Sequence, residues 1–269
     1  MPSGLRELLS HRSIIRKLVA RELKDCYARS TLGPLWTMLS PVLIMAVVCF
    51  VSSHLLSVTV EHFGVYVLSA LILWNFFAQA TSRSTGCLQR HPTDKETDAP
   101  ASVHVLAAVL AAGVNFVVTL LPLAVIVLLV GHPFRPALAF LPVSIALATL
   151  FALGISLALA PLSVLFAGVS PIYRFVLMAW MFLTPIFYPV AALPDAYRRI
   201  LVLNPMTHLV EAFRTPIYWG VMPSRNVLIT STVAGLGTLV IGWLVFQRYS
   251  ERALRTMTEP TMIHRSRLG

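Results

Sequence analysis

Charged residues are scarce in this chain of 269 residues: they make up 12% of it, against about 25% in an ordinary soluble domain. Hydrophobic residues make up 57%. This balance excludes a disordered chain, which needs the opposite composition, and argues against a soluble globular fold. Three cysteines are too few for a disulfide scaffold. Short strands at regular spacing are missing too, which argues against an outer-membrane barrel, so a helical protein of the inner or plasma membrane remains.

The sequence also lacks the motifs of common catalytic and energy-coupling sites. Its three lysines follow Arg16, Leu23 and Asp94, and none follows a glycine, so there is no phosphate-binding GxxxxGK[ST] loop. No HExxH, HxxxH, CxxC or GxSxG pattern occurs, and we therefore expect no metal or cofactor on this chain. The long apolar runs carry no Asp, Glu or Lys, which removes the usual ion relay of a secondary carrier. A transport chain of this kind has to take its energy from a partner.

Six apolar runs are long enough to cross about 30 Å of hydrocarbon, which takes about 20 helical residues. Apart from Arg174, every Lys, Arg, Asp and Glu lies outside these runs. The sequence therefore predicts an all-α integral membrane protein with six transmembrane helices. We place them at 35–57, 64–82, 103–130, 138–166, 172–190 and 226–246.

The basic residues predict the orientation, because cytoplasmic loops carry the excess of Lys and Arg. Sixteen of the 21 basic residues lie on one side of the predicted spans: seven before the first span, three in 83–102, one in the turn before the fifth span and five in the tail. We therefore expect both termini to be cytoplasmic. The net charge of +10 reflects topology and contact with lipid headgroups, and we expect no nucleic-acid partner.

The first 30 residues form a segment of their own, ahead of a membrane domain at 31–247 and a basic tail at 248–269. Within 5–27, apolar residues such as Leu18 gather on one helical face and basic residues lie mostly on the other. This pattern favours a cytoplasmic amphipathic helix that lies flat in the membrane interface. The alternative is a solvated helix that packs on its own chain.

Two polar segments interrupt the predicted spans. The cytoplasmic segment 83–102 holds an acidic stretch between Pro92 and Pro100, and the spacing of Thr93 and Glu96 is that of a capping box. It predicts either a short helix that docks a cytoplasmic partner or a plain solvated loop. The external segment 191–225 offers two helices, Asp195–Leu203 and Thr207–Gly220, with a turn at Asn204-Pro205. We expect a re-entrant hairpin there, with a peripheral amphipathic cap as the alternative.

Aromatic residues form the remaining pattern. Aromatic faces stack on the apolar faces of sugar rings, so such residues suit the path of a polymer, although most aromatic residues in membrane proteins serve packing or interfacial belts. Our candidates for a substrate path are Trp36, Trp74, Phe76, Phe77, Trp180, Phe187, Tyr188, Tyr218 and Trp219.

Four segments resemble the membrane permeases of ATP-binding-cassette exporters for polysaccharides, of the O-antigen, capsule or teichoic acid type. They are RELKDCYARSTLGPLWTMLSP (21–41), YVLSALILWNFF (66–77), FLTPIFYPVAALP (182–194) and LNPMTHLVEAFR (203–214). Their order and spacing agree over essentially the whole chain. One departure is QRHPTDKETDAP (89–100), which is acidic where the family has a basic, aromatic run, and this suggests a matching basic groove on the partner.

The resemblance implies a homodimer of this chain with two ATP-binding cassette subunits, which hold ATP and Mg, so that this chain is not itself an enzyme. It implies a lipid-linked glycan substrate and a coupling role for 83–102 and the N-terminal helix. The implied coupling residues are Arg21, Lys24, Asp25, Thr93, Asp94, Lys95, Glu96 and Asp98, and the implied external gate is Asn204, Pro205, Glu211 and Arg214. An exporter of drugs or lipids and a membrane enzyme acting on lipid-linked sugars remain as alternatives.

Overall fold

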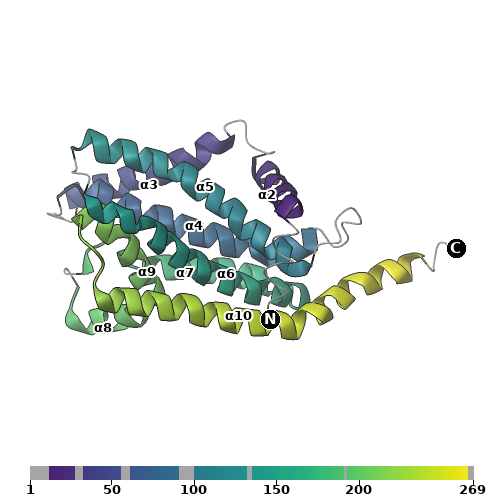
Figure 1. Cartoon of the computed structure of the whole chain (residues 1–269). Coiled ribbons are helices and arrows are strands. Elements are labelled where there is room, and N and C mark those ends of the chain that lie inside the picture. The colour runs from purple at the N-terminus through teal and green to yellow at the C-terminus, as the bar shows by residue number, and fades with distance from the viewer. Residues whose placement is uncertain are drawn as a thin grey trace.

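A computed structural model describes residues 12–27, 33–55, 61–90, 100–131, 135–190 and 193–265. Helices and their connections account for these residues, and none of them lies in a strand. The long helices run side by side in one elongated bundle (Figure 1). In chain order the elements are α2 (Arg12–Tyr27), α3 (Gly33–Leu55), α4 (Phe63–Arg90), α5 (Ala101–Leu129), η1 (Pro136–Phe140), α6 (Leu141–Leu165), α7 (Val169–Phe182), α8 (Asp195–Leu203), α9 (Pro205–Arg214), η3 (Thr215–Trp219) and α10 (Arg225–Arg265).

Five of these segments are long and apolar enough to cross a membrane, which fits an integral membrane protein. They have between 20 and 32 residues, and each falls on a run that the sequence predicted as a span. The five are Leu35–His54, Phe63–Arg90, Ala101–Leu129, Pro136–Leu165 and Arg225–Thr256.

The run at 172–190 differs from the expected continuous span. Here α7 has 14 residues and ends at Phe182, so it is about 21 Å long. The chain then leaves the helix through 183–189, where Pro185 and Pro189 each lack the N–H that a continuing helix needs. A hydropathy pattern records that a segment is apolar but not whether its backbone stays helical, and for this reason the run appeared as one helix.

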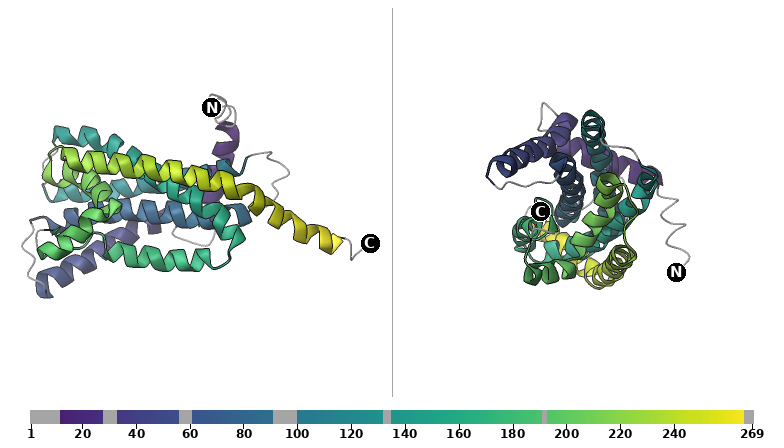
Figure 2. Two further views of the ribbon diagram at one scale, coloured as in Figure 1. Left: turned by 90° about the horizontal axis from the view of Figure 1, so that it is seen from below. Right: turned by 90° about the vertical axis from the view of Figure 1, so that its left-hand side faces the viewer.

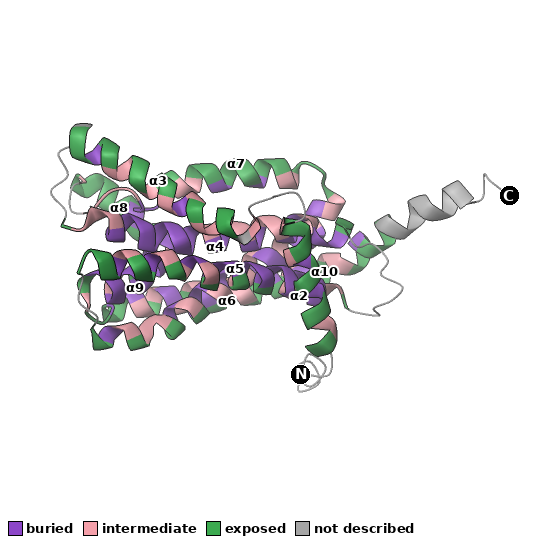
Figure 3. Cartoon of the chain, turned by 90° about the horizontal axis from the view of Figure 1, so that it is seen from above, coloured by how far each residue is buried: buried purple, intermediate pink, exposed green. Residues whose placement is uncertain are grey.

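Helix α4 occupies the centre of the bundle. Its side chains from Val65 to Leu73 are at most 5% exposed, and it packs against α5, α6, α7 and α9. Figure 3 shows α4 as mostly buried, whereas α3 and α7 are mostly exposed at the outside. The helix also runs eight residues further than its predicted end, through Arg83 to Arg90, so that the first part of the expected polar segment 83–102 is helical.

Helices α6 and α10 pack with their backbones close together. A Cβ atom on Gly242 would overlap the backbone of Gly154, and one on Gly154 would overlap the backbone at Thr238. Small residues of this kind let two membrane helices bring their backbones together and gain van der Waals contact. The pair α6–α10 therefore depends on these glycines.

The two ends of the bundle differ in their covering elements. Helix α2 crosses the bundle near the end from which the C-terminal part of α10 projects, and α8 and α9 lie at the opposite end (Figure 2). Leu18 of α2 packs against Val103 and Ala107 of α5, so this helix rests on its own chain.

The segment that we predicted to be external forms two helices, and α8 has the predicted bounds Asp195–Leu203. Helix α9 begins at Pro205, two residues before the predicted Thr207, and passes into the π-helical turn η3. Met206, Leu209, Val210 and Phe213 are fully buried, because this face of α9 packs into the bundle against α4, α6 and α10.

Candidate functional site

An ion pair joins α2 to the end of α4. The Nη2 atom of Arg90 lies 3.3 Å from Oε1 of Glu22 and donates to it, and the carboxylate side chain is only 8% exposed. Arg83, two turns earlier on α4, donates to the Glu22 carbonyl and to Sγ of Cys26. Three contacts between charged or polar groups therefore fix α2 to the last two turns of α4.

The position of Glu22 follows from the amphipathic pattern of α2. Leu18 and Glu22 are four residues apart, so both lie on the face that meets the bundle. The predicted coupling residues Arg21, Lys24 and Asp25 lie on the exposed part of the same helix. The other five, Thr93, Asp94, Lys95, Glu96 and Asp98, fall outside the described residues.

The C-terminal end of α2 is attached by a second polar contact. The Tyr27 hydroxyl donates to Oδ1 of Asn115 on α5, and Nδ2 of Asn115 donates to Oε1 of Gln79 on α4 over 3.1 Å. Asn115 is 1% exposed, and burial raises the pKa of the Tyr27 phenol, so its proton stays available for donation at neutral pH. A chain of three polar side chains thus ties α2 to the interior of the bundle.

Asn204 organises the opposite end of the molecule. Its Oδ1 accepts from the Met206 N–H at 3.0 Å, which caps α9, and from the Trp180 indole at 2.8 Å. Its Nδ2 donates to the Leu183 carbonyl and to Oγ1 of Thr184. One side chain therefore connects the α8–α9 turn to the end of α7, with Pro205 at the first position of α9.

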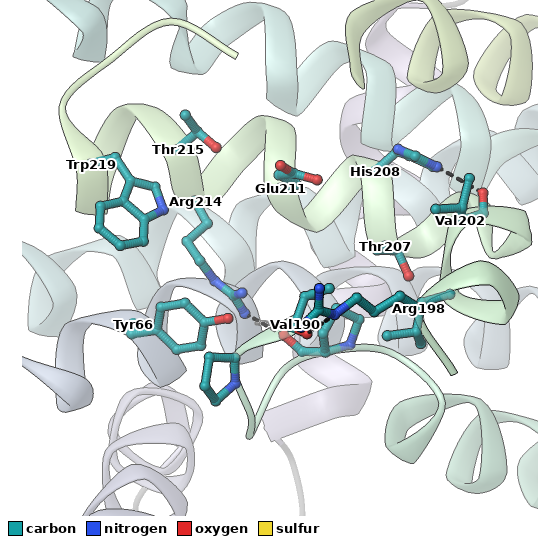
Figure 4. Close-up of a pocket in the computed structure, with 13 residues that line it drawn as sticks. Tyr66, Val190, Arg198, Val202, Thr207, His208, Glu211, Arg214, Thr215 and Trp219 are labelled. Carbon is teal, nitrogen blue, oxygen red and sulfur yellow. Dashed lines mark hydrogen bonds between the residues drawn. The ribbon is translucent and has the colours of Figure 1, made fainter. Parts of the chain in front are cut away.

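A cavity of about 410 Å³ opens between α4, the segment after α7, α8 and α9 (Figure 4). It is lined by Glu211 and Arg214, the two charged residues of the predicted external gate, and Trp219 lies at its edge. The remaining lining residues are Tyr66, Pro185, Pro189, Val190, Arg198, Leu201, Val202, Thr207, His208 and Thr215.

Arg214 is the most constrained side chain of this cavity. It is 5% exposed, its Nη2 donates to the Pro185 carbonyl at 2.7 Å, and its guanidinium lies 3.8 Å from the centre of the Tyr66 ring. Among the described residues no carboxylate lies within ion-pair distance of it. Burial lowers the pKa of Arg214, but an arginine stays protonated at neutral pH, so the cavity wall holds a buried cation.

The predicted substrate-path aromatics are divided between the core and the surface. Trp74, Phe76 and Phe77 are at most 3% exposed and fill the core around α4, with the Phe77 and Trp180 ring centres 5.4 Å apart. The exposed members are Trp36 at 52% and Trp219 at 57%, whereas Tyr218 is buried and Trp180, Phe187 and Tyr188 are half-buried.

Several residues of these sites were missed from the sequence. Glu22 was hidden among the charges of an amphipathic helix, although its spacing from Leu18 placed it on the buried face. Gln79 and Asn115 were visible as polar residues inside apolar runs. Tyr66, Thr207 and His208 carried no sequence signal for the external cavity, because only the fold brings α4 next to α9.

Comparisons with known proteins agree with this architecture. A family model described as ABC-2 type transporter matches residues 14–218. The chain is 27% identical over 250 residues to the O-antigen export system permease protein RfbA of Myxococcus xanthus, covering 92% of this chain and 96% of that protein. It is 24% identical to the protein of the same name from Klebsiella pneumoniae, over 86% of this chain and 90% of that one. It is also 24% identical to the polysialic acid transport protein KpsM of Escherichia coli, over 90% of this chain and 95% of that protein.

Proposed function

The chain belongs to the ABC-2 type transporter membrane family, and from this premise we propose that it is the permease subunit of an exporter for a lipid-linked polysaccharide. The observation that carries this function is the similarity to O-antigen and polysialic acid transport proteins over 86–92% of the chain. The five long apolar helices support a membrane conduit.

In this proposal the energy comes from two ATP-binding cassette subunits that pair with a homodimer of this chain. ATP and Mg bind to those subunits, and this chain is not catalytic. The sequence supports this division of labour because it holds no phosphate-binding loop.

The proposed topology has six crossings with both termini in the cytoplasm of a bacterial cell. The fifth crossing consists of α7 and the non-helical segment after it, which protein must cover because lipid cannot satisfy free backbone groups. Helices α8 and α9 enter from the external face as the re-entrant pair, and the basic face of α2 rests on the cytoplasmic headgroups. The distribution of basic residues, sixteen of 21 on the proposed cytoplasmic side, supports this orientation.

The coupling route in this proposal runs through the segment that follows Arg90. ATP binding moves the partner subunits, which press on residues 91–99 and on the exposed residues of α2. Because Arg90 is paired with Glu22, a displacement of that segment acts on α2 and α4 together. A ligand shifts such an equilibrium only through different contacts in the two states, so the partner must bind 91–99 differently with and without ATP.

The test is to co-purify the chain with the ATP-binding cassette protein encoded nearest to its gene and to reconstitute both in lipid vesicles. We expect lipid-linked glycan extracted from the same cells to stimulate ATP hydrolysis and to become protected inside inverted vesicles. Stimulation by drugs or simple lipids instead would support the first alternative. Turnover of the lipid-linked sugar by this chain alone would support a membrane enzyme. Either result would contradict the proposed function.

A further inference from the structure

The external cavity contains polar atoms whose hydrogen-bonding capacity is unused. Among the described residues, Nε of Arg214, Oγ1 of Thr207 and Nδ1 of His208 have no hydrogen-bond partner, and each atom has less than 1 Å² exposed. All three residues line the cavity and are at most 9% exposed. Buried polar groups are normally paired, because leaving them unpaired costs free energy. Three unpaired atoms in the wall of one cavity point to a group that binds there.

The hydrogen-bond donors and acceptors in the cavity wall indicate the chemistry of the group that binds there. His208 bonds the Val202 carbonyl through Nε2, so this nitrogen donates and Nδ1 of the neutral ring accepts. Arg214 can only donate, the Thr207 hydroxyl can do both, and the Glu211 carboxylate accepts. Phosphate and carboxylate groups only accept, so they could pair with Arg198 and Arg214 but would leave Nδ1 of His208 without a donor and would meet the Glu211 carboxylate. Sugar hydroxyls both donate and accept hydrogen bonds, so they match this mixture of donors and acceptors in the cavity wall.

The shape of the cavity agrees with a sugar ring. Its volume of about 410 Å³ lies in the range of small-molecule sites. Thr207, Glu211 and Arg214 are spaced by four and three residues, so they share one face of α9. Opposite them Pro189, Val190 and Leu201 give apolar surface beside the guanidinium of Arg198, and Trp219 offers an exposed ring at the edge (Figure 4).

We propose that this cavity holds one hydroxyl-rich sugar residue of the glycan as it leaves the permease, an inference that rests on the function proposed above. Thr207, His208, Glu211 and Arg214 bond its hydroxyls, and the Trp219 ring covers its apolar face. The three unpaired atoms lie just behind the cavity surface, so binding requires small rotations of Thr207 and His208, while Arg214 keeps its bond to the Pro185 carbonyl. Thr207 and His208 then gain the hydrogen bonds that they lack here.

Thr207→Val tests this assignment, because valine has nearly the same shape without the hydroxyl. If the Thr207 hydroxyl does not contact the glycan, its removal leaves export unchanged, because this hydroxyl has no hydrogen-bond partner in the protein. If it binds the sugar, export falls by about fivefold, the usual effect of one hydrogen bond, while the melting temperature stays the same or rises. The matched control is Thr149→Val, whose hydroxyl already bonds the Ile145 carbonyl, and we expect it to export normally. Normal export by Thr207→Val would overturn the proposal.

Glu211→Gln separates a hydroxyl site from an anion site. Glu211 is exposed, so the change leaves the fold intact. At a hydroxyl site the amide is a weaker acceptor than the carboxylate, and export falls by a few fold. At an anion site the substitution removes a repelling charge, and export rises. An increase in export would therefore overturn the proposal.

A photo-crosslinking residue at position 219 gives a readout other than export rate. Illumination of exporting cells should attach the glycan to this position, which glycan staining of the purified chain detects. The control position is Leu129, which is 80% exposed at the end of α5. Equal labelling at both positions, or none at 219 while glycan reaches the cell surface, would overturn the proposal. Absence of glycan export by the unmodified complex would instead contradict the proposed function.

Discussion

Arg90 and Glu22 form an ion pair between the end of α4 and the middle of α2, with 3.3 Å between Nη2 and Oε1. The two side chains differ in exposure, at 41% for the arginine and 8% for the glutamate. The pair thus sits at the boundary of the bundle, next to the segment that we propose to contact the ATPase. It links the one helix that crosses the bundle to the helix at its centre.

Glu22→Gln should weaken this link without preventing folding. The neutral amide can still accept a hydrogen bond from Arg90 but loses the charge, and for a pair between the buried and exposed limits we expect a cost of about 1–2 kcal/mol. ATP hydrolysis by the reconstituted complex should persist while export drops several-fold. Glu251→Gln is the matched control, because its pair with Arg255 is about 80% exposed on both sides. Equal effects of the two substitutions would contradict a coupling role for Glu22.

Glu96→Lys combined with Asp98→Lys should uncouple the permease from its partner. Both residues belong to the acidic stretch that we expect to enter a basic groove of the ATPase, and reversing their charge turns attraction into repulsion. We expect export to fall at least about tenfold, the effect of losing 1.4 kcal/mol of coupling, with hydrolysis retained by the ATPase. The measurements are glycan export and hydrolysis in vesicles. Unchanged export in this variant would count against the docking assignment.

The apolar runs predicted most of the fold because hydrocarbon excludes charge so strongly. For this reason the span at 64–82 lies within α4, and the span at 138–166 covers all of α6, which ends at Leu165. The same rule failed at two boundaries. It ended α4 before Arg83, although a helix can continue into water once its charged residues find partners such as Glu22. It also extended α7 past Phe182, because Pro185 and Pro189 are apolar residues that break a helix.

The candidate site was predicted less completely than the fold. Asn204-Pro205 and the block through Arg214 located the external end, since a turn and a helix start have local sequence patterns. The partners of Arg214 did not follow from the sequence: Tyr66 is 148 residues away, and the Pro185 carbonyl is a backbone atom with no residue preference. A cavity forms where packed side chains leave space unfilled. The hydrophobic periodicity of a sequence carries no information about such space.

Tyr27→Phe should loosen the end of α2. The substitution keeps the ring but removes the donor to Asn115, and we expect a loss of about 0.5–1.5 kcal/mol in the attachment of this helix. Hydrogen–deuterium exchange of α2 amides in the detergent-solubilised complex measures the effect, which should appear as faster exchange near residue 27. Tyr197→Phe on α8 is the control, because that side chain is 61% exposed. Unchanged exchange in Tyr27→Phe would show that the contacts of Leu18 and Glu22 hold the helix without this hydrogen bond.

Gly242→Ala should separate α6 from α10. The added Cβ atom would overlap the backbone of Gly154, which cannot move aside as a flexible side chain can, so the helices must shift and lose contact. We expect a cost of about 1–3 kcal/mol, seen as a lower melting temperature and a smaller yield of dispersed protein after extraction. Gly237→Ala lies on the same helix with no atom within 4 Å of the new Cβ, so its melting temperature should be unchanged or slightly higher, because alanine favours the helix. A similar loss in both variants would mean that glycine is needed along α10 for bending rather than for contact, and would contradict the close packing of α6 on α10.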